Sequence, residues 1–387
     1  MPSTTAIVLI NSLEVGGAER AVQAAVAELR RRHRQVHLVC LEPPTAAPAL
    51  PFRALSRMRG SAGGFVKLAA LPVLALRLSR FVSAVDADVV MSHLFRANFV
   101  NVLARQWGGS RHRVILVNHT RLSRLRTEGL QGRINWALSR WLYPRADVVA
   151  SVSTGAAAES ARLLGLGERA VVLHDPIEAA TAGTEASATP EQPGILVCMG
   201  RMVALKRFQD AICAFARLAA RRPGLRLRLV GDGPQRTALE QLAARLAVAD
   251  RVDFLGTVDN PGGLLAGSAA FISSSETEGF GMAIVEALAA GVPVVASDCA
   301  FGPREILSPG SDPSRLLEAE ADFEVAEFGL LYPVGSVDAL ERALWRILCD
   351  DRLRAGLSRG GPSRAADFSV TRAGNEYERL LFRAEAP

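Results

Sequence analysis

Two glutamates, Glu278 and Glu286, flank the short turn Gly279-Phe280-Gly281. Apolar stretches at 269–272 and 292–296 lie on either side, so the segment is predicted to run as strand, polar loop, helix and strand. The turn leaves backbone N–H groups open at the start of that helix, where an anionic or hydroxyl-rich ligand is favoured. Carboxylates accept hydrogen bonds from sugar or ribose hydroxyls. At this spacing alone, an amphipathic helix with solvated glutamates is the simpler interpretation.

Two cations, Arg201 and Lys206, follow the apolar run 194–199. Arginine offers a planar fork and lysine a point charge, a combination that suits two adjacent phosphates. The sequence shows no compact Asp-x-Asp pair or histidine cluster on a loop after a strand. We therefore expect fixed cations, and no metal, to neutralise a leaving diphosphate. The alternative is a basic helix start on the protein surface.

Further candidates follow strands of the first half. Gly16 and Gly17 come after the run 6–10, where glycines permit a close backbone approach to a phosphate or sugar, although a strand-to-helix turn often needs glycine for steric reasons alone. His119 follows the run 114–118 and is the preferred catalytic histidine. His93 is a competing candidate, and His174 is expected to shape a turn between domains.

Strand-like runs alternate with helical ones along the whole chain of 387 residues, a length that predicts two domains. This pattern predicts an α/β fold with parallel sheets covered by helices on both faces. The expected domains are residues 1–178 and 194–370, joined by a linker at 179–193 that is rich in Ala, Thr, Gly and Pro, with a last helix in 371–387. The predicted strands are 6–10, 36–41, 88–92, 114–118, 147–151 and 170–173 in the first half, and 194–199, 225–230, 252–255, 270–273 and 293–296 in the second.

Taken together, these segments resemble the signature of retaining glycosyltransferase family four. The resemblance extends from residue 10 to about residue 300, in the order and spacing of that family. The matching elements are Gly16-Gly17-Ala18-Glu19-Arg20, Gly200-Arg201 with Lys206-Arg207-Phe208, Val230-Gly231-Asp232-Gly233-Pro234, Phe254-Leu255-Gly256 and the segment 273–291. Because Gly231 lies in a turn that lacks the third glycine of a dinucleotide fingerprint, a purely structural role there is as good an interpretation as nucleotide contact.

The resemblance implies the GT-B fold, two Rossmann-like domains facing across a cleft, with the acceptor in the first domain and the nucleotide sugar mostly in the second. It also implies that Glu286 binds the ribose hydroxyls, that Glu278 binds the transferred sugar and that His119 contacts that sugar. The last helix would cross back to the first domain. The implied catalytic residues are His119, Glu278, Arg201 and Lys206, and the implied donor-binding residues are Gly16, Gly17, Arg201, Lys206, Gly231, Glu278, Gly279, Phe280, Gly281 and Glu286.

The predicted function is a retaining, metal-independent glycosyltransferase without a cofactor. It would move a sugar from a nucleotide diphosphate sugar, with UDP preferred, to a glycan or lipid-linked acceptor in bacterial polysaccharide or lipopolysaccharide synthesis. The segment Phe301-Gly302-Pro303-Arg304-Glu305 resembles family members that use N-acetylhexosamine donors. The alternatives are a nucleotide-sugar epimerase on the same fold and a non-catalytic protein that binds anionic lipid.

Positive charge is concentrated in residues 1–178, with 23 Lys and Arg against 12 Asp and Glu, whereas the whole chain has a net charge of +6. This asymmetry predicts an anionic partner for the first half, although a GC-rich genome would also favour arginine. Arg53, Arg57, Arg59, Lys67, Arg77 and Arg80 surround the apolar run 65–78, so an anionic membrane surface is one expected partner. The alternative is that this run is a core helix packed on the first sheet. Low aromatic content argues against nucleic acid. The protein is expected in the cytoplasm. Binding of the basic surface to lipid would place it on the cytoplasmic face of the inner membrane.

Overall fold

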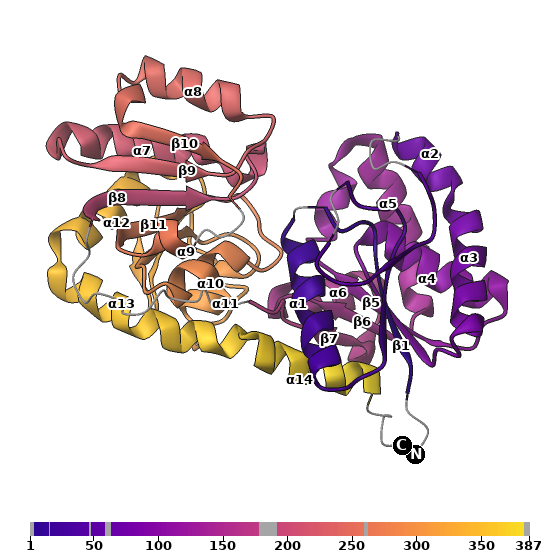
Figure 1. Cartoon of the computed structure of the whole chain (residues 1–387). Helices are drawn as coiled ribbons and strands as arrows, with labels where there is room; N and C mark the ends of the chain where they lie inside the picture. The colour runs from indigo at the N-terminus through magenta and orange to yellow at the C-terminus, as the bar shows by residue number, and fades with distance from the viewer. Residues whose placement is uncertain are drawn as a thin grey trace. The chain divides into compact units, whose positions relative to one another are not determined.

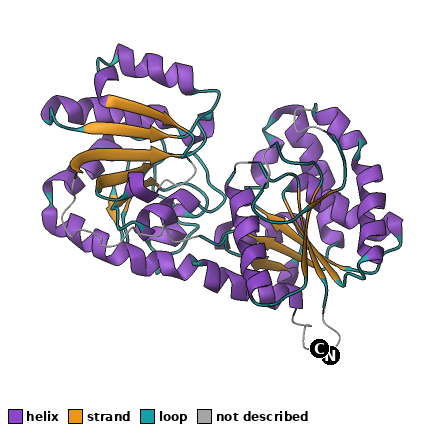
Figure 2. Cartoon of the chain, viewed as in Figure 1, coloured by secondary structure: helices purple, strands orange, loops and turns teal. Residues whose placement is uncertain are grey.

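The computed structural model describes residues 4–14, 16–45, 48–58, 63–177, 192–258 and 262–382. The chain divides into two compact units, Met1–Pro176 with Val370–Pro387 and Ile177–Ser369. Each unit is built on its own sheet, as Figures 1 and 2 show. The predicted linker at 179–193 falls almost wholly outside the described residues.

The first unit is built on a seven-stranded sheet of order β3-β2-β1-β4-β5-β6-β7, in which every neighbouring pair is parallel. Its central strands are continuous apolar runs, as expected for strands covered on both faces. All five residues of β1 are buried, for example. The strands are β1 (Ala6–Ile10), β2 (Val36–Cys40), β3 (Arg53–Ala54), β4 (Val89–His93), β5 (Arg113–Asn118), β6 (Val148–Ser151) and β7 (Ala170–Val172).

Helices cover both faces of this sheet, with α1 and α14 on one face and α3 and α4 on the other (Figure 1). The helices are α1 (Gly17–Arg31), α2 (Gly64–Ala69), α3 (Leu71–Ala84), α4 (Phe95–Gly108), α5 (Gly129–Leu142), α6 (Thr154–Leu164) and α14 (Val370–Phe382), with short 3-10 turns η1 (Ser123–Arg126), η2 (Tyr143–Arg145) and η3 (Gly167–Arg169).

The last helix, α14, packs on α1 through a close helix contact and a cluster of charged bonds. Gly374 allows the close approach, because a Cβ atom there would lie 2.7 Å from Cγ of Glu28. Arg32 then joins the two helices, donating to Glu28 at 2.7 Å and to Glu378 at 2.9 Å. The C-terminal helix is therefore part of the first unit.

The second unit repeats the architecture, with a seven-stranded sheet of order β10-β9-β8-β11-β12-β14-β13. All pairs are parallel except β13 with β14, which is antiparallel. The strands are β8 (Gln192–Met199), β9 (Arg226–Val230), β10 (Val252–Gly256), β11 (Ser268–Ser273), β12 (Val294–Ser297), β13 (Glu324–Val325) and β14 (Leu330–Tyr332).

In this unit α12 packs on α7 and α13 packs on α10. The helices are α7 (Phe208–Arg221), α8 (Arg236–Arg245), α9 (Gly262–Leu265), α10 (Met282–Ala289), α11 (Pro303–Leu307), α12 (Val337–Cys349) and α13 (Asp351–Ala365), with 3-10 turns η4 (Ala204–Lys206), η5 (Ala249–Arg251) and η6 (Ala366–Phe368). Each sheet lies on its own apolar core. The expectation of two doubly wound α/β domains is confirmed.

Every strand predicted from the sequence is present, whereas β3, β13 and β14 were not predicted. Among the described residues, no helix combines the length and the apolar character needed to cross a bilayer.

Candidate active site

A pocket of about 1040 Å³ opens in the first unit, where parallel strands of the sheet end. This edge is where open α/β sheets usually bind ligands. Ten of its 19 lining residues carry an amide, hydroxyl or carboxylate group, which can bind a hydroxyl-rich ligand, and apolar residues make up most of the rest of the wall. The lining residues are Asn11, Ser12, Glu14 and Glu19 after β1, Glu42, Pro43, Pro44 and Thr45 after β2, Leu94, Phe95 and Arg96 after β4, Asn118, His119 and Thr120 after β5, and Gly64, Lys67, Leu68, Gln131 and Asn135 from α2 and α5.

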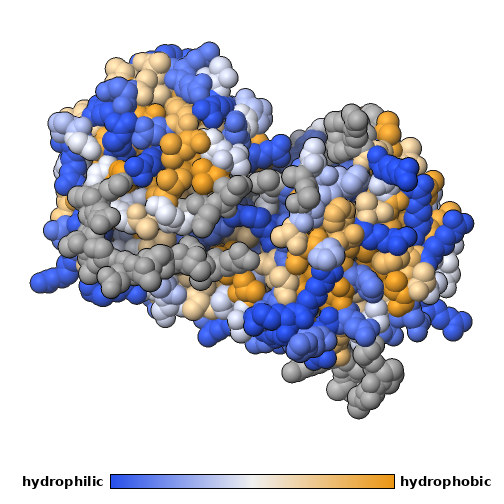
Figure 3. All heavy atoms as spheres, viewed as in Figure 1, coloured by the Kyte–Doolittle hydropathy of each residue, from blue (hydrophilic) through white to orange (hydrophobic). Residues whose placement is uncertain are grey.

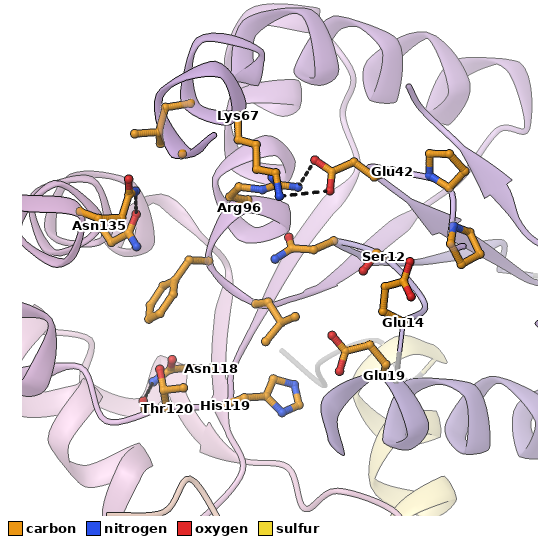
Figure 4. A pocket seen from close by; sticks show the side chains of 18 of the residues that line it. Ser12, Glu14, Glu19, Glu42, Lys67, Arg96, Asn118, His119, Thr120 and Asn135 are labelled. Carbon is orange, nitrogen blue, oxygen red and sulfur yellow. Dashed lines mark hydrogen bonds and ion pairs between the residues drawn. The ribbon is translucent and has the colours of Figure 1, made fainter. Parts of the chain in front are cut away.

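A buried carboxylate fixes two cations in one wall of this pocket (Figure 4). Glu42 is 2% exposed and accepts a hydrogen bond of 2.8 Å from Arg96. The ammonium group of Lys67 lies 3.8 Å from the same carboxylate. Next to Glu42 the two cations outnumber the carboxylate, whereas Glu14 and Glu19 also line the pocket. The sequence placed Lys67 among the cations of an outer surface, but its ammonium group turns into the pocket.

His119 lies in another part of the pocket wall and belongs to a buried chain of polar groups. Its Nε2 atom is 2.9 Å from Nδ1 of His93, and its Nδ1 atom is 3.5 Å from Oδ2 of Asp175. His93 and Asp175 are 0% and 4% exposed. Tyr377 of α14 stacks on the His93 ring with an interplanar angle of 8°. Burial, and next the neighbouring His119, lower the pKa of His93 well below its usual value.

The two glycines after β1 lie at the start of α1. Gly16 is the N-cap residue, in an extended conformation, and Gly17 is the first helical residue. A Cβ atom on Gly16 would lie 2.2 Å from Oε2 of Glu19, which lines the pocket. Glycine at position 16 therefore leaves room for this carboxylate beside the helix start.

In the second unit, the structure brings Lys206 and Glu278 together. The Nζ atom of Lys206 lies 2.6 Å from Oε1 of Glu278, and the hydroxyl of Ser275 donates to the same oxygen at 2.6 Å. Lys206 ends η4, after β8, and Glu278 lies in the loop after β11. Because β8 and β11 are parallel neighbours, the two loops leave the sheet at the same edge.

The other predicted cation, Arg201, is exposed in the loop after β8, and its side chain has no hydrogen bond or ion pair within the described ranges. The preceding residue, Gly200, has a φ of 148°. A Cβ atom on Gly231 would lie 2.0 Å from the carbonyl oxygen of Gly200. A glycine is thus required at position 231 by the close approach of two backbone segments. Its contact with the nucleotide-sugar donor stays a prediction.

The turn Gly279-Phe280-Gly281 leads directly into α10. Gly281 has a φ of 110° and is the N-cap residue of that helix. Phe280 is 2% exposed, and its ring packs edge-to-face on Phe368 at 4.9 Å between centroids. Any donor contact of Phe280 would therefore be made by its backbone. Glu286 lies half-buried within α10.

Two family profiles together match most of the chain. The profile described as "Glycosyltransferase Family 4" matches residues 15–180, and the one described as "Glycosyl transferases group 1" matches residues 183–364. The chain belongs to glycosyltransferase family 4. The resemblance to glycosyltransferase family four is thereby confirmed, and so is the assignment as an enzyme that transfers sugars, whereas retention of configuration stays a prediction.

Curated relatives of this glycosyltransferase include a Campylobacter jejuni protein named N-acetylgalactosamine-N,N'-diacetylbacillosaminyl-diphospho-undecaprenol 4-alpha-N-acetylgalactosaminyltransferase. The two are 26% identical over 97% of this chain and 98% of that protein. A lipopolysaccharide core biosynthesis glycosyltransferase, LpsE of Rhizobium meliloti, is 34% identical over 50% of this chain and 51% of its own length.

Solved structures confirm the GT-B fold of the glycosyltransferase. Sucrose-phosphate synthase of Thermosynechococcus elongatus superposes with a TM-score of 0.78 at 20% identity, over 97% of this chain and 98% of that one. Anabaena HepE, solved in complex with UDP, gives a TM-score of 0.75 at 20% identity, over 98% and 99% of the two chains.

Several groups of the candidate site were not identified from the sequence: Ser275, Asp175 and the set of Glu42 with its two cations. Glu42 follows β2 at the edge where ligands bind, so its position in the sequence could have identified it as a candidate site residue.

Arg304 belongs to the segment 301–305, which is similar to that of family members using N-acetylhexosamine donors. It is 5% exposed and binds Asp298 at 2.6 Å and Glu324 at 2.9 Å. The Arg304 guanidinium therefore links these two carboxylates and stabilises the local structure.

Proposed function

We propose that this glycosyltransferase is a retaining, metal-independent enzyme of bacterial cell-surface glycan synthesis. It takes a sugar, of the N-acetylhexosamine class, from a UDP-linked donor and passes it to a glycan carried on a lipid. The name of the Campylobacter jejuni relative, which matches over nearly its whole length, supports the acceptor class and the sugar class. The UDP complex of Anabaena HepE supports the nucleotide.

The observation that carries the proposal is the meeting of Lys206 with Glu278 beside Ser275, where strands β8 and β11 end. A departing diphosphate needs positive charge, which Lys206 and the exposed Arg201 supply without a metal ion. The sugar needs hydrogen-bond acceptors, which the Glu278 carboxylate supplies. Glu286, about one turn into α10, is assigned to the ribose hydroxyls.

The acceptor binds in the pocket of the first unit. Its amides, hydroxyls and carboxylates suit a glycan, and the cationic wall formed by Lys67 and Arg96 suits a phosphate attached to that glycan. The pairing of Glu42 with both cations holds them in place before the acceptor arrives. His119 occupies a separate part of the wall, beside Asn118 and Thr120 (Figure 4).

Transfer proceeds on one face of the sugar. The bond from the anomeric carbon to the diphosphate oxygen breaks while the acceptor hydroxyl forms its bond to that carbon on the same face. The hydroxyl proton passes to the departing phosphate oxygen, so the products are a glycoside and a nucleoside diphosphate. No carboxylate identified from the sequence is placed as a nucleophile for a double displacement, which favours this front-side route.

The lipid part of the acceptor implies contact with a membrane, and helices α2 and α3 offer a surface for it. Val66, Val73 and Leu76 are 57%, 51% and 44% exposed. Arg77 and Arg80 are exposed on α3 beside them. Apolar and basic side chains on one surface bind an anionic bilayer interface. Figure 3 shows orange and blue atoms interleaved over this part of the first unit. The enzyme therefore works at the cytoplasmic face of the inner membrane.

A panel of nucleoside diphosphates and nucleotide sugars, scored by thermal shift and then by turnover, tests this function. UDP and one UDP-N-acetylhexosamine should raise the melting temperature, and that donor should be consumed when a lipid-linked glycan is added. Stabilisation by none of the panel would reject the proposed donor class.

A further inference from the structure

The two loops that carry Lys206 and Glu278 are fastened to each other by bonds that do not involve the ion pair. The hydroxyl of Ser274 donates to the carbonyl of Lys206 at 2.8 Å, and the amide of Glu276 donates to the carbonyl of Leu205 at 2.8 Å. The amide of Glu278 donates to Ala300 at 3.2 Å. These bonds would therefore hold both loops in place if the side chains of Lys206 and Glu278 separated.

In the ligand-free protein, the side chains of Lys206 and Glu278 bind each other, although the proposed function requires both of them to bind the donor. Lys206 Nζ lies 2.6 Å from Oε1 of Glu278, which Ser275 also contacts. The side chains are 27% and 11% exposed, so solvent and ligand can reach them. Partly exposed ion pairs are weakly stabilising and can be exchanged for another partner. In the ligand-free protein the Glu278 carboxylate therefore cancels the charge that a diphosphate would use.

We propose that Glu278 makes the site discriminate between the intact donor and the spent nucleoside diphosphate; this inference rests on the proposed function. A diphosphate competes with Glu278 for Lys206. When the diphosphate carries its sugar, the sugar hydroxyls donate to Glu278 and replace the ammonium group. When the sugar has gone, the Glu278 carboxylate lies beside the phosphates with fewer hydrogen-bond donors, and the repulsion expels the product.

The size of the effect follows from like charges at close range. Two negative charges a few ångströms apart in a partly exposed protein site repel by enough to change a dissociation constant on the order of tenfold. Removing the charge of Glu278 should therefore tighten the binding of the bare diphosphate by about that factor. The intact donor should gain nothing, because the same change weakens its hydrogen bonds from the sugar.

Calorimetric titration of UDP, and of the UDP-sugar with the largest thermal shift, into four proteins tests this inference. The proteins are the natural chain, Glu278→Gln, Lys206→Ala and the control Glu276→Gln. Glu276 is an exposed glutamate of the same loop, so its replacement makes the same charge change two residues away. We expect Glu278→Gln to bind UDP about tenfold more tightly, to bind the UDP-sugar no better, and to be inhibited more strongly by UDP. The affinities of Glu276→Gln for UDP and for the UDP-sugar should stay within twofold of those of the natural chain.

Equal or weaker binding of UDP by Glu278→Gln would overturn the inference, because Glu278 would then orient Lys206 toward the phosphate and not compete for it. Glu278→Ala serves as a second variant if the glutamine protein does not fold. If the natural chain binds neither UDP nor a UDP-sugar, the proposed function fails together with the inference. If UDP binds and Lys206→Ala weakens it while Glu278→Gln changes nothing, only the inference fails.

Discussion

The Nε2 atom of His119 lies 2.9 Å from the Nδ1 atom of His93. Because the other ring nitrogen of His119 faces Asp175, both nitrogens have protein partners in the wall of the pocket. In the tautomer that fits both contacts, the Nδ1–H of His119 points to the carboxylate and its Nε2 accepts from Nδ1 of His93. His119 is therefore held in one orientation, and its predicted contact with the sugar would be made by a rigid ring.

The buried histidines predict that the protein loses stability in mild acid. Burial, and next the charge of Arg105, lower the pKa of His112 to about 4. Burial, and next the neighbouring His119, lower the pKa of His93 well below its usual value. The unfolded chain, with histidine pKa values of about 6.5, binds more protons than the native state below that pH, so stability is full above about pH 6.5 and falls as the pH falls.

From its pKa of about 4, His112 alone should lower the free energy of unfolding by on the order of 2 kcal/mol between pH 7 and pH 5. Urea unfolding at pH 7, 6 and 5 measures this, and His112→Gln should flatten the dependence. His33→Asn is the control, because His33 is exposed and has a positive φ of 59° that asparagine tolerates. An unchanged slope in His112→Gln would show that His112 does not cause the loss.

Removing a cation of the proposed diphosphate site should slow transfer. Lys206→Ala and Arg201→Ala are each expected to lower kcat by on the order of 100-fold, the scale of losing one preorganised group that stabilises developing charge. Chelation with EDTA should have little effect. Natural-like rates in both variants, or loss of activity on chelation, would assign the neutralising charge to other groups.

The two glutamates should differ in kinetic effect. Glu286→Ala is expected to raise KM for the donor about tenfold with little change in kcat, since a ribose contact is made in both ground and transition states. Glu278→Gln should mainly lower kcat, since it faces the sugar whose bond breaks. Steady-state kinetics at varied donor concentration separates the two outcomes. Losses confined to KM at both positions would show that Glu278 is wrongly assigned.

The surface of α2 and α3 should bind anionic vesicles. Sedimentation with phosphatidylglycerol vesicles is expected to rise with anionic lipid, to fall with salt, and to weaken several-fold in Val73→Ser with Leu76→Ser or in Arg77→Gln with Arg80→Gln. The control replaces Arg245 and Arg352, exposed arginines of the second unit, by glutamine. Failure of the natural chain to bind at low salt would leave this surface without a membrane role.

The sheets were predictable because parallel strands buried on both faces are continuous apolar runs, as in β1 and β5. The strands that were missed are very short: β3 and β13 have two residues each, and β14 has three. The apolar run 65–78 was interpreted either as a membrane-binding surface or as a core helix, and the structure divides it between core and surface. Leu71 and Leu74 of α3 enter the core, whereas Val73 and Leu76 stay exposed.

The candidate site residues were named from the sequence, but the pairings between them could not be predicted. Lys206 and Glu278 were assigned to phosphate and sugar, yet their contact depends on loop geometry that residue spacing does not fix. His93 and His119 were weighed as competing candidates, but His93 ends β4, His119 follows the neighbouring strand β5, and the two rings bind each other. Asp175 follows β7 and reaches His119 only because the fold brings these distant loops together.

The most direct test of the proposed function is the structure of the reaction product. The purified protein is incubated with EDTA, the UDP-sugar that binds in the thermal-shift panel, and a polyprenyl-diphosphate-linked glycan, and the new linkage is examined by NMR. We predict transfer of the sugar to the glycan, with the α configuration of the donor retained and UDP released. An inverted linkage, conversion of the donor to its epimer without transfer, or no reaction by a folded protein that binds UDP would contradict this function.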